Sequence, residues 1–222
     1  MKPLLRLLAI ASLAATVRAS DAAVLRGTLA VPAAPPAAHH MNAYPGHADA
    51  MPSHTMAPRG AVNDAVLWIE RIPAAAESAL AAAPAPARPK LAQKDQCFMP
   101  RVVSVAAGGS VDFPNQDPIY HNVFSVSTTR RFDLGKYPKG KSRSVLFPKP
   151  GIVNVYCDIH SDMAAFVIVT PNRAYTQPNA DGEWAMPDLP AGRYVLHVWH
   201  PDFAEFTRDV ELSADRKLAL SY

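Results

Sequence analysis

Three side chains that bind soft metal ions follow one another at intervals of three residues, at Cys157, His160 and Met163. They offer a thiolate, an imidazole and a thioether. Thiolate and thioether favour Cu(I), whereas imidazole serves both Cu(I) and Cu(II). A trigonal copper site with one thiolate and two imidazoles needs a second histidine, which His121 can supply from an earlier segment. We therefore predict a copper site with these ligands, in which Met163 is the weak axial one.

The segments around these ligands carry a family resemblance. From about Gln96 to Thr170 the chain resembles the cupredoxins, or blue copper proteins. His121-Asn122-Val123 is similar to the first-ligand segment of plastocyanin, and Val153 to Cys157, preceded by Pro150-Gly151, looks like the strand that delivers the cysteine. The Cys-x₂-His-x₂-Met spacing matches the amicyanin type of ligand loop. Taken whole, the chain resembles periplasmic plastocyanin-like proteins labelled methylamine-utilisation proteins.

This resemblance implies one type 1 copper bound by His121, Cys157, His160 and Met163. It also implies that the side chain of Asn122 ties the two ligand segments together, with His160 as the ligand on the solvent side. Such a site exchanges one electron without changing its ligands. We therefore expect an electron carrier between redox partner proteins, and not an enzyme.

Other functions remain open from the sequence. A copper chaperone, buffer or sensor could use the same ligands. A copper oxidase or nitrite reductase would need further ligands in His-x-His patterns, which the sequence lacks. A metal-free interaction domain, or a buried thiol beside an unrelated surface histidine, would leave the complete ligand set unexplained.

A second group of soft-metal side chains lies in the Pro- and Ala-rich segment Pro32 to Arg59. Four histidines and three methionines gather there: His39, His40, Met41, His47, Met51, His54 and Met56. This composition is typical of soft-metal binding, so we expect a secondary and weaker copper site. The alternative is a disordered Ala/Pro loop in which these residues have no role. The segment is the feature that favours copper handling over electron transfer.

Residues 1–19 have the pattern of a secretory signal. Lys2 and Arg6 precede the apolar stretch Leu7 to Val17, and small residues follow at the expected cleavage position. The stretch is too short to span a bilayer, so we expect a periplasmic protein without a membrane span in its mature form. The formal net charge of +3 falls to about zero once Lys2, Arg6 and Arg18 are removed. Bulk attraction to nucleic acid or membranes is therefore not expected.

Short strands punctuated by Gly and Pro turns dominate residues 97–170, which predicts a Greek-key β-sandwich. The expected strands are Arg101–Val105, Ser110–Phe113, Asn122–Val126, Ser142–Phe147, Ile152–Tyr156 and Ala165–Val169. Two further strands are expected earlier in the chain, at Ala23 to Val31 and at Asn63 to Ile72.

The end of the chain resembles half of a second sandwich. Asp181-Gly182-Glu183-Trp184 and Leu189 to Tyr194 are similar to turns of the carboxypeptidase regulatory-like, or transthyretin-like, fold. We therefore expect an all-β protein in which the cupredoxin is inserted into this sandwich. The predicted divisions are a signal (1–19), a first half-sandwich (22–72, with the His/Met-rich loop 32–59), an Ala/Pro linker with a short helix near Ala74 to Ala82 (73–90), the cupredoxin (91–170) and a second half-sandwich (171–222). The competing layout assigns Ala65 to Glu70 to the cupredoxin as an edge strand.

Two further features bear on function. Cys97 is expected to be a small buried hydrophobe on the first cupredoxin strand, because Cys157 is already used as a ligand. The segment Arg130 to Lys149 carries seven Lys and Arg residues and one acidic residue, Asp133. It is either a solvated hairpin or a basic docking surface for an acidic redox partner, where charge would raise the rate of encounter.

Overall fold

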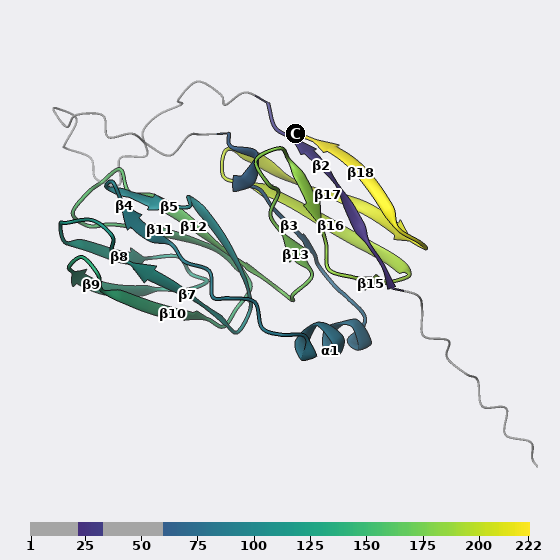
Figure 1. Ribbon diagram of the computed structural model, residues 1–222, viewed down its shortest axis with the longest axis horizontal. Coiled ribbons are helices and arrows are strands. Elements are labelled where there is room, and N and C mark those ends of the chain that lie inside the picture. Colours follow the sequence, from purple (N-terminus) through teal and green to yellow (C-terminus); the bar gives the residue numbers. More distant parts are fainter. Residues whose placement is uncertain (1–21, 33–59) are drawn as a thin grey trace, which may run out of the picture.

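The computed structural model describes residues 22–32 and 60–222 of the chain, and the all-β prediction is confirmed for them (Figure 1). Eighteen strands are joined with one α-helix and one short 3₁₀ helix in this part of the protein. The expected signal (1–19) and all seven residues of the His/Met-rich segment lie outside the described residues. No helix among the described residues is long and apolar enough to cross a bilayer.

Two sheets and a hairpin enclose the first hydrophobic core. The larger sheet has the order β6-β12-β11-β8-β9, and β7 and β10 form a second, antiparallel pair. A hairpin of β4 and β5 adds to this half. The strands are β4 (Ala92–Lys94), β5 (Cys97–Met99), β6 (Val102–Ala106), β7 (Gly109–Pro114), β8 (His121–Ser125), β9 (Phe132–Tyr137), β10 (Ser142–Phe147), β11 (Gly151–Tyr156) and β12 (Ala164–Thr170).

Alternation along these strands explains why they form a sandwich. Val111 and Phe113 of β7 and Val145 and Phe147 of β10 are buried at alternate positions, and Val111 pairs directly with Val145. Successive side chains of a strand point to opposite faces, and one apolar face per sheet is enough to make a core. The same cluster contains Cys157 and Met163, so the expected ligand loop is anchored in this core.

A second core lies between a four-stranded sheet, β13-β3-β16-β17, and a three-stranded sheet, β14-β2-β18. A two-stranded pair, β1 with β15, lies at its margin. Its elements are β1 (Ala22–Ala23), β2 (Leu25–Ala30), the 3₁₀ helix (Val62–Asp64), β3 (Val66–Ile69), β13 (Tyr175–Thr176), β14 (Glu183–Ala185), β15 (Leu189–Pro190), β16 (Gly192–His200), β17 (Phe203–Leu212) and β18 (Arg216–Ser221).

Strands from the two ends of the described chain share this second core. The first long strand, β2, pairs in parallel with the last strand, β18, and β3 pairs with β13 and β16 (Figure 1). The competing layout, with Ala65 to Glu70 at the edge of the other sandwich, is therefore not what the strand pairing shows. These pairings are those that an inserted first sandwich requires. That residues 91–170 form an independent unit stays a prediction.

Several local expectations differ from the structure in extent. The helix α1 (Ala74–Ala82) begins and ends where expected, but the strand expected at Asn63 to Ile72 starts with a 3₁₀ turn and shortens to β3. The basic segment holds two strands and not one, because β9 also forms and pairs with β8. This strand was not expected, since Gly135 and the charged residues Asp133 and Lys136 interrupt its apolar side chains. Cys97 is half-buried and lies outside the first core, so its expected place as a buried hydrophobe is wrong. Neither it nor Cys157 forms a disulfide.

Candidate metal centre

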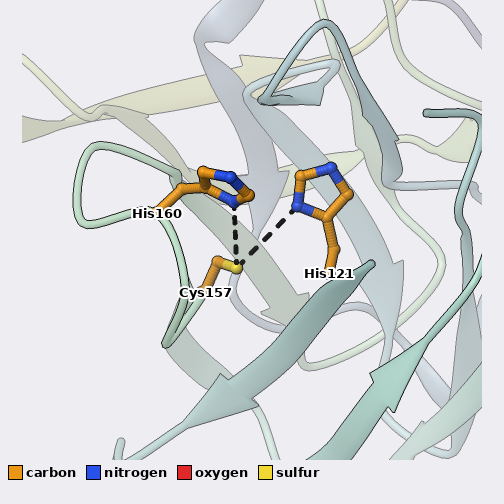
Figure 2. Close-up of side chains that lie close together, drawn as sticks. All are labelled: His121, Cys157 and His160. Atoms are coloured by element: carbon orange, nitrogen blue, oxygen red, sulfur yellow. Dashed lines mark hydrogen bonds between the residues drawn. The ribbon is translucent and has the colours of Figure 1, made fainter. Parts of the chain in front are cut away.

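Three of the four expected ligands converge at one end of the first sandwich. His121 is the first residue of β8, Cys157 follows the last residue of β11, and His160 lies in the loop that leads to β12 (Figure 2). The ligand atoms of the three residues all lie within 4.8 Å of one another. Within the described residues, this is the one group of three or more His, Cys, Asp or Glu side chains that could hold a metal ion.

The distances fit a metal bound between the three side chains. Cys157 Sγ lies 4.0 Å from His121 Nδ1 and 3.9 Å from His160 Nδ1. A metal held at about 2.0 to 2.3 Å by two nitrogens and a sulfur in a trigonal plane places the sulfur about 3.8 Å from each nitrogen. The donor set, one thiolate and two imidazoles, is the set that suits copper. The residues present therefore fit type 1 copper in both chemistry and spacing.

The ligand loop is closed by its own backbone. The N–H group of Cys157 donates to the carbonyl of Met163, and the N–H group of Met163 donates to the carbonyl of His160. These bonds fold residues 157–163 into a compact turn that presents Cys157 and His160 from one segment. The side chain of Met163 is 1% exposed and packs in the same core as Cys157, which leaves its axial role a prediction.

Hydrogen bonds favour the thiolate form of Cys157. Burial raises the pKa of this thiol. The hydrogen bond with His121 and those from the backbone N–H groups of Asn122, Ile159 and His160 lower the pKa, and together they outweigh the effect of burial. The net result is a pKa below the usual value for cysteine. Because the thiolate is the metal-binding form, these donors prepare the sulfur for a cation.

The imidazole of His121 is fully buried, and a carboxylate bonds to the ring nitrogen that faces away from Cys157. Its Nε2 lies 2.7 Å from Asp117 Oδ2, which is also buried. Burial lowers the pKa of His121, but the bonds to Cys157 and Asp117 outweigh it, so the pKa lies above the usual value for histidine. His160 is only half-buried, which makes it the more accessible of the two imidazoles.

Asp117 was not among the residues expected at the site. A carboxylate four residues before a candidate ligand was the available signal, but in a loop this spacing does not determine which way the side chains point. Burial raises the pKa of Asp117, whereas the N–H groups of Gln96 and Asp95 and the His121 ring lower it below its usual range. The carboxylate is thus kept ionised beside the expected ligand.

Asn122 links the two ligand segments in a different way from the expected one. Its side-chain Nδ2 donates to Asp133 Oδ1 of β9, at 2.7 Å, and its buried Oδ1 has no hydrogen-bond partner within residues 22–32 and 60–222. The side chain therefore ties β8 to β9 and not to the ligand loop. The link to the loop is made by the backbone N–H of Asn122, which bonds to Cys157.

The basic segment reaches the margin of the site. Six of its seven cationic side chains are exposed: Arg131, Lys136, Lys139, Lys141, Arg143 and Lys149. Lys136 Nζ lies 3.9 Å from Asp158 Oδ2, on the residue after Cys157. Both partners of this ion pair are well exposed, so the pair itself adds little stability. The ion pair matters for its position, because it brings the ammonium group of Lys136 to the ligand loop.

No protein-family model and no curated protein matches the chain. Among solved structures, it is similar to amicyanin from Paracoccus versutus, with 22% identity over 40% of this chain and 87% of that one, at a TM-score of 0.34. A purple cupredoxin from Nitrosopumilus maritimus shares 22% identity over 34% of this chain and 83% of that one, at a TM-score of 0.32.

A Cu-containing nitrite reductase from Thermus scotoductus SA-01 is similar at 24% identity over 39% of this chain, with a TM-score of 0.36. The chain spans only 23% of the length of that reductase. The identities are below 25% and the TM-scores below 0.5. What the site can bind therefore follows from its own residues, and these form a buried, thiolate-containing centre of the kind that suits copper.

Proposed function

We propose that this protein is an exported type 1 copper protein that carries single electrons between redox partners in the periplasm. The observation that supports this most is the convergence of Cys157 Sγ with the Nδ1 atoms of His121 and His160, at 4.0 and 3.9 Å. These three donors match the thiolate and imidazoles of such a centre. Export is supported by the pattern of residues 1–19.

Each residue of the centre has a separate task in this proposal. Copper, when bound, supplies a one-electron couple. Cys157, His121 and His160 would hold the ion, and Met163, buried in the core beside them, would be a weak fourth ligand. Strands β8 and β11 and the hydrogen-bonded turn of residues 157–163 fix these side chains in advance. Because little has to move when the charge changes, electron transfer is fast in both directions.

The two histidines differ in their access to a partner. His121 is fully buried, whereas His160 is half-buried and lies next to the exposed side chain of Ile159. We assign His160 as the ligand through which electrons enter and leave the centre. The cationic side chains of the Arg130–Lys149 segment lie on β9, β10 and their connections, and Lys136 reaches the ligand loop. An acidic redox protein docking there would be steered toward His160.

The test is to load the protein with Cu(II) and to record its visible spectrum and voltammogram. A thiolate-to-Cu(II) charge-transfer band and a reversible one-electron wave are expected. Reduction of the loaded protein by an acidic redox protein should slow as salt is added, because screening weakens steering between exposed charges. A colourless complex, or one without a reversible wave, would contradict the electron-carrier proposal.

Copper handling is the second candidate, and the His/Met-rich composition of residues 39–56 favours it. Deleting residues 39–56 should lower the amount of copper bound in excess metal and leave the visible spectrum unchanged. Rapid transfer of copper from the full chain to a copper-free acceptor, without a reversible redox wave, would favour a chaperone or buffer. Unchanged stoichiometry after the deletion would mean that this segment binds no copper.

A further inference from the structure

The structure assigns Asp117 as a positioning residue for the metal centre. We propose that its carboxylate fixes the ring tautomer and orientation of His121 and lowers the reduction potential of the bound metal. The first part concerns the protein by itself, and the second rests on the proposed function. Asp117 lies in the β7–β8 connection and is 5% exposed, so it can act on the centre from the interior of the protein.

The hydrogen bond between the two side chains determines which ring nitrogen is left for a metal. Asp117 Oδ2 lies 2.7 Å from His121 Nε2. An ionised carboxylate can only accept a hydrogen bond, so Nε2 carries the proton. In the neutral ring Nδ1 then has a free lone pair, and Nδ1 is the atom that lies 4.0 Å from Cys157 Sγ. A partner on the other ring nitrogen is how proteins orient metal-binding histidines.

Asp117 is itself held in place by the β4–β5 turn. The backbone N–H of Asp95 donates to Oδ1 at 2.6 Å, and that of Gln96 donates to Oδ2 at 2.9 Å. Asp95 and Gln96 have positive φ angles of 55° and 56°, as in a two-residue hairpin turn of type I′. Such angles cost non-glycine residues about 1 kcal/mol each or more, and the two charge-assisted bonds to Asp117 offset this cost.

The backbone of Asp117 is fixed as well. Its N–H donates to Asn115 Oδ1 at 2.9 Å, while Asn115 Nδ2 donates to the carbonyls of Ile119 and Tyr137. Asn115, 1% exposed, therefore braces the loop that carries Asp117 toward His121. The carboxylate thus accepts from two backbone N–H groups and from the His121 ring, and Asn115 holds the backbone of the same residue. A solely structural aspartate would not need the bond to His121.

A buried negative charge on the far side of a ligand favours the more positive state of the metal. Asp117 makes the imidazole of His121 a stronger donor, and Cu(II) gains more from this than Cu(I). Replacing an outer hydrogen-bond partner of a metal-bound histidine costs about 10- to 100-fold in affinity. If Cu(II) alone is affected, this change corresponds to a potential raised by about 60 to 120 mV for a one-electron couple.

The decisive comparison is Asp117→Asn against Asp158→Asn in the full chain. Both variants remove one carboxylate close to the site, but Asp158 is an exposed residue that pairs with Lys136 and makes no bond to His121. The potential is measured by voltammetry of the copper-loaded proteins. Asp117→Asn should raise it by about 60 to 120 mV, and Asp158→Asn should raise it much less, because exposed charges are screened by water. Equal shifts in the two variants would overturn the second part of the proposal.

The copper-free protein tests the first part by itself. Ring ¹⁵N chemical shifts of His121, recorded at alkaline pH, should show a proton on Nε2 in the original chain and in Asp158→Asn. In Asp117→Asn the amide can offer either an oxygen or an NH₂ group, so this preference should be lost. An unchanged tautomer in Asp117→Asn would overturn the assignment.

The two kinds of failure can be told apart. If the original chain gives no charge-transfer band with copper, the proposed function is wrong, and so is the proposed effect of Asp117 on the reduction potential. The tautomer of His121 in the copper-free protein then still decides whether Asp117 positions this ring. If Asp117→Asn loses stability against urea but keeps the original tautomer and potential, Asp117 merely supports the β4–β5 turn, and the proposal is wrong.

Discussion

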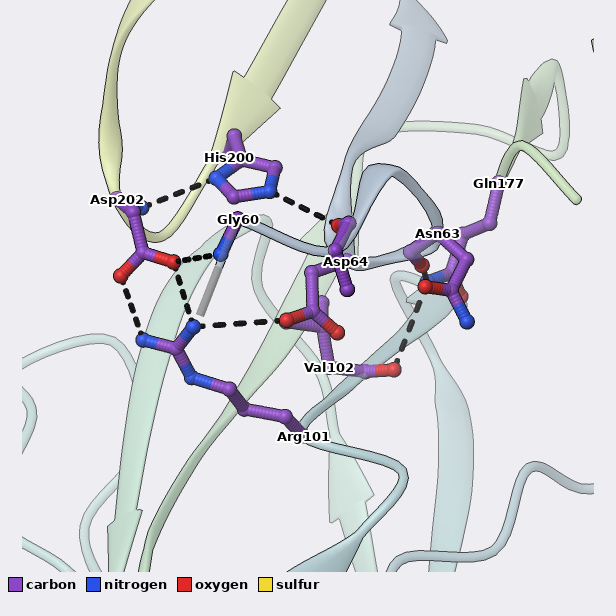
Figure 3. Close-up of polar contacts among 9 residues, drawn as sticks. Gly60, Asn63, Asp64, Arg101, Val102, Gln177, His200 and Asp202 are labelled. Carbon is purple, nitrogen blue, oxygen red and sulfur yellow. Dashed lines mark hydrogen bonds and ion pairs between the residues drawn. The ribbon is translucent and has the colours of Figure 1, made fainter. Parts of the chain in front are cut away.

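Arg101 donates a pair of parallel hydrogen bonds to Asp202, at 2.7 and 2.8 Å, and so joins the two sandwiches (Figure 3). Arg101 immediately precedes β6 of the first sandwich, and Asp202 immediately precedes β17 of the second. The arginine side chain is 14% exposed and the aspartate 9% exposed, so the pair is shielded from solvent. A small apolar cluster around Val66, Val102 and Trp199 packs between β3 and β16 of the second sandwich and β6 and β12 of the first. The two halves are therefore fastened by both polar and apolar contacts.

Two aspartates at this junction should respond to pH in opposite ways. Asp64, 3.5 Å from Arg101, has its pKa raised from 3.8 to about 6, because burial outweighs the attraction of the arginine. Burial also raises the pKa of Asp202, but the hydrogen bonds from Arg101 and Gly60 lower it below the usual value. The folded state thus disfavours the charge on Asp64 and favours the charge on Asp202.

Asp64→Asn should stabilise the protein at neutral pH. Between about pH 4 and 6 the folded state binds more protons at Asp64 than the unfolded state does, so this residue makes stability fall as pH rises through that window. The substitution removes the fall and raises the free energy of unfolding at pH 7 by up to about 3 kcal/mol. Urea unfolding of the copper-free protein at several pH values measures it. A variant that is less stable than the original at pH 7 would contradict the prediction.

Asp202→Asn is the matched substitution, and it should change the free energy of unfolding in the opposite direction. The stability that Asp202 contributes is present above its unfolded pKa and is lost as pH falls through its lower folded pKa. The variant should lose about 2 kcal/mol at pH 7, since two charge-assisted hydrogen bonds from a buried arginine are weakened. Equal urea midpoints for Asp202→Asn and the original chain would show that the Arg101 pair adds nothing to stability.

Cys157→Ser should abolish the colour of the copper-loaded protein, because the absorption needs a thiolate bound to Cu(II). Cys97→Ser is the control, since Cys97 lies in β5 and outside the group of converging ligand atoms. It should leave the visible spectrum unchanged. A colourless Cys97 variant beside a coloured Cys157 variant would show that the wrong thiol has been assigned.

Met163→Leu should retain copper and raise the reduction potential. A thioether is a weak and long ligand in such centres, and an apolar replacement of similar size removes a donor that Cu(II) uses. Titration with copper and voltammetry would measure the two effects. A large loss of copper affinity would mean that Met163 is a principal ligand, or that the centre is of another type.

Residues 90–170 should fold and bind copper as a separate fragment. The first core is built from residues between Leu91 and Val169, so the fragment retains it completely. Residues 171–222 should not fold alone, because β16 and β18 of that piece pair with β3 and β2 from the start of the chain. Circular dichroism and urea unfolding of both fragments test the insertion. Cooperative unfolding of 171–222, or a collapsed 90–170, would refute it.

The sequence alone determined the chemistry of the centre. Cys157, His160 and Met163 lie close enough in the chain for one loop to present all three, and a thiolate together with an imidazole and a thioether is a donor set that suits a soft metal. The strands were predictable where polar and apolar side chains alternate, as in β7, and the helix α1 where an alanine run follows a proline. These features depend on neighbours in the sequence and therefore need no tertiary information.

What only the tertiary structure decided depends on contacts between distant residues. The direction of the Asn122 side chain is set by Asp133 on the neighbouring strand, and the Asp117 carboxylate is aimed at His121 by the β4–β5 turn. The joining of β2 to β18 and of Arg101 to Asp202 likewise brings together segments that share no local pattern. Local preferences cannot encode such pairings, because burial and hydrogen bonding across the fold select among many arrangements that each segment alone would allow.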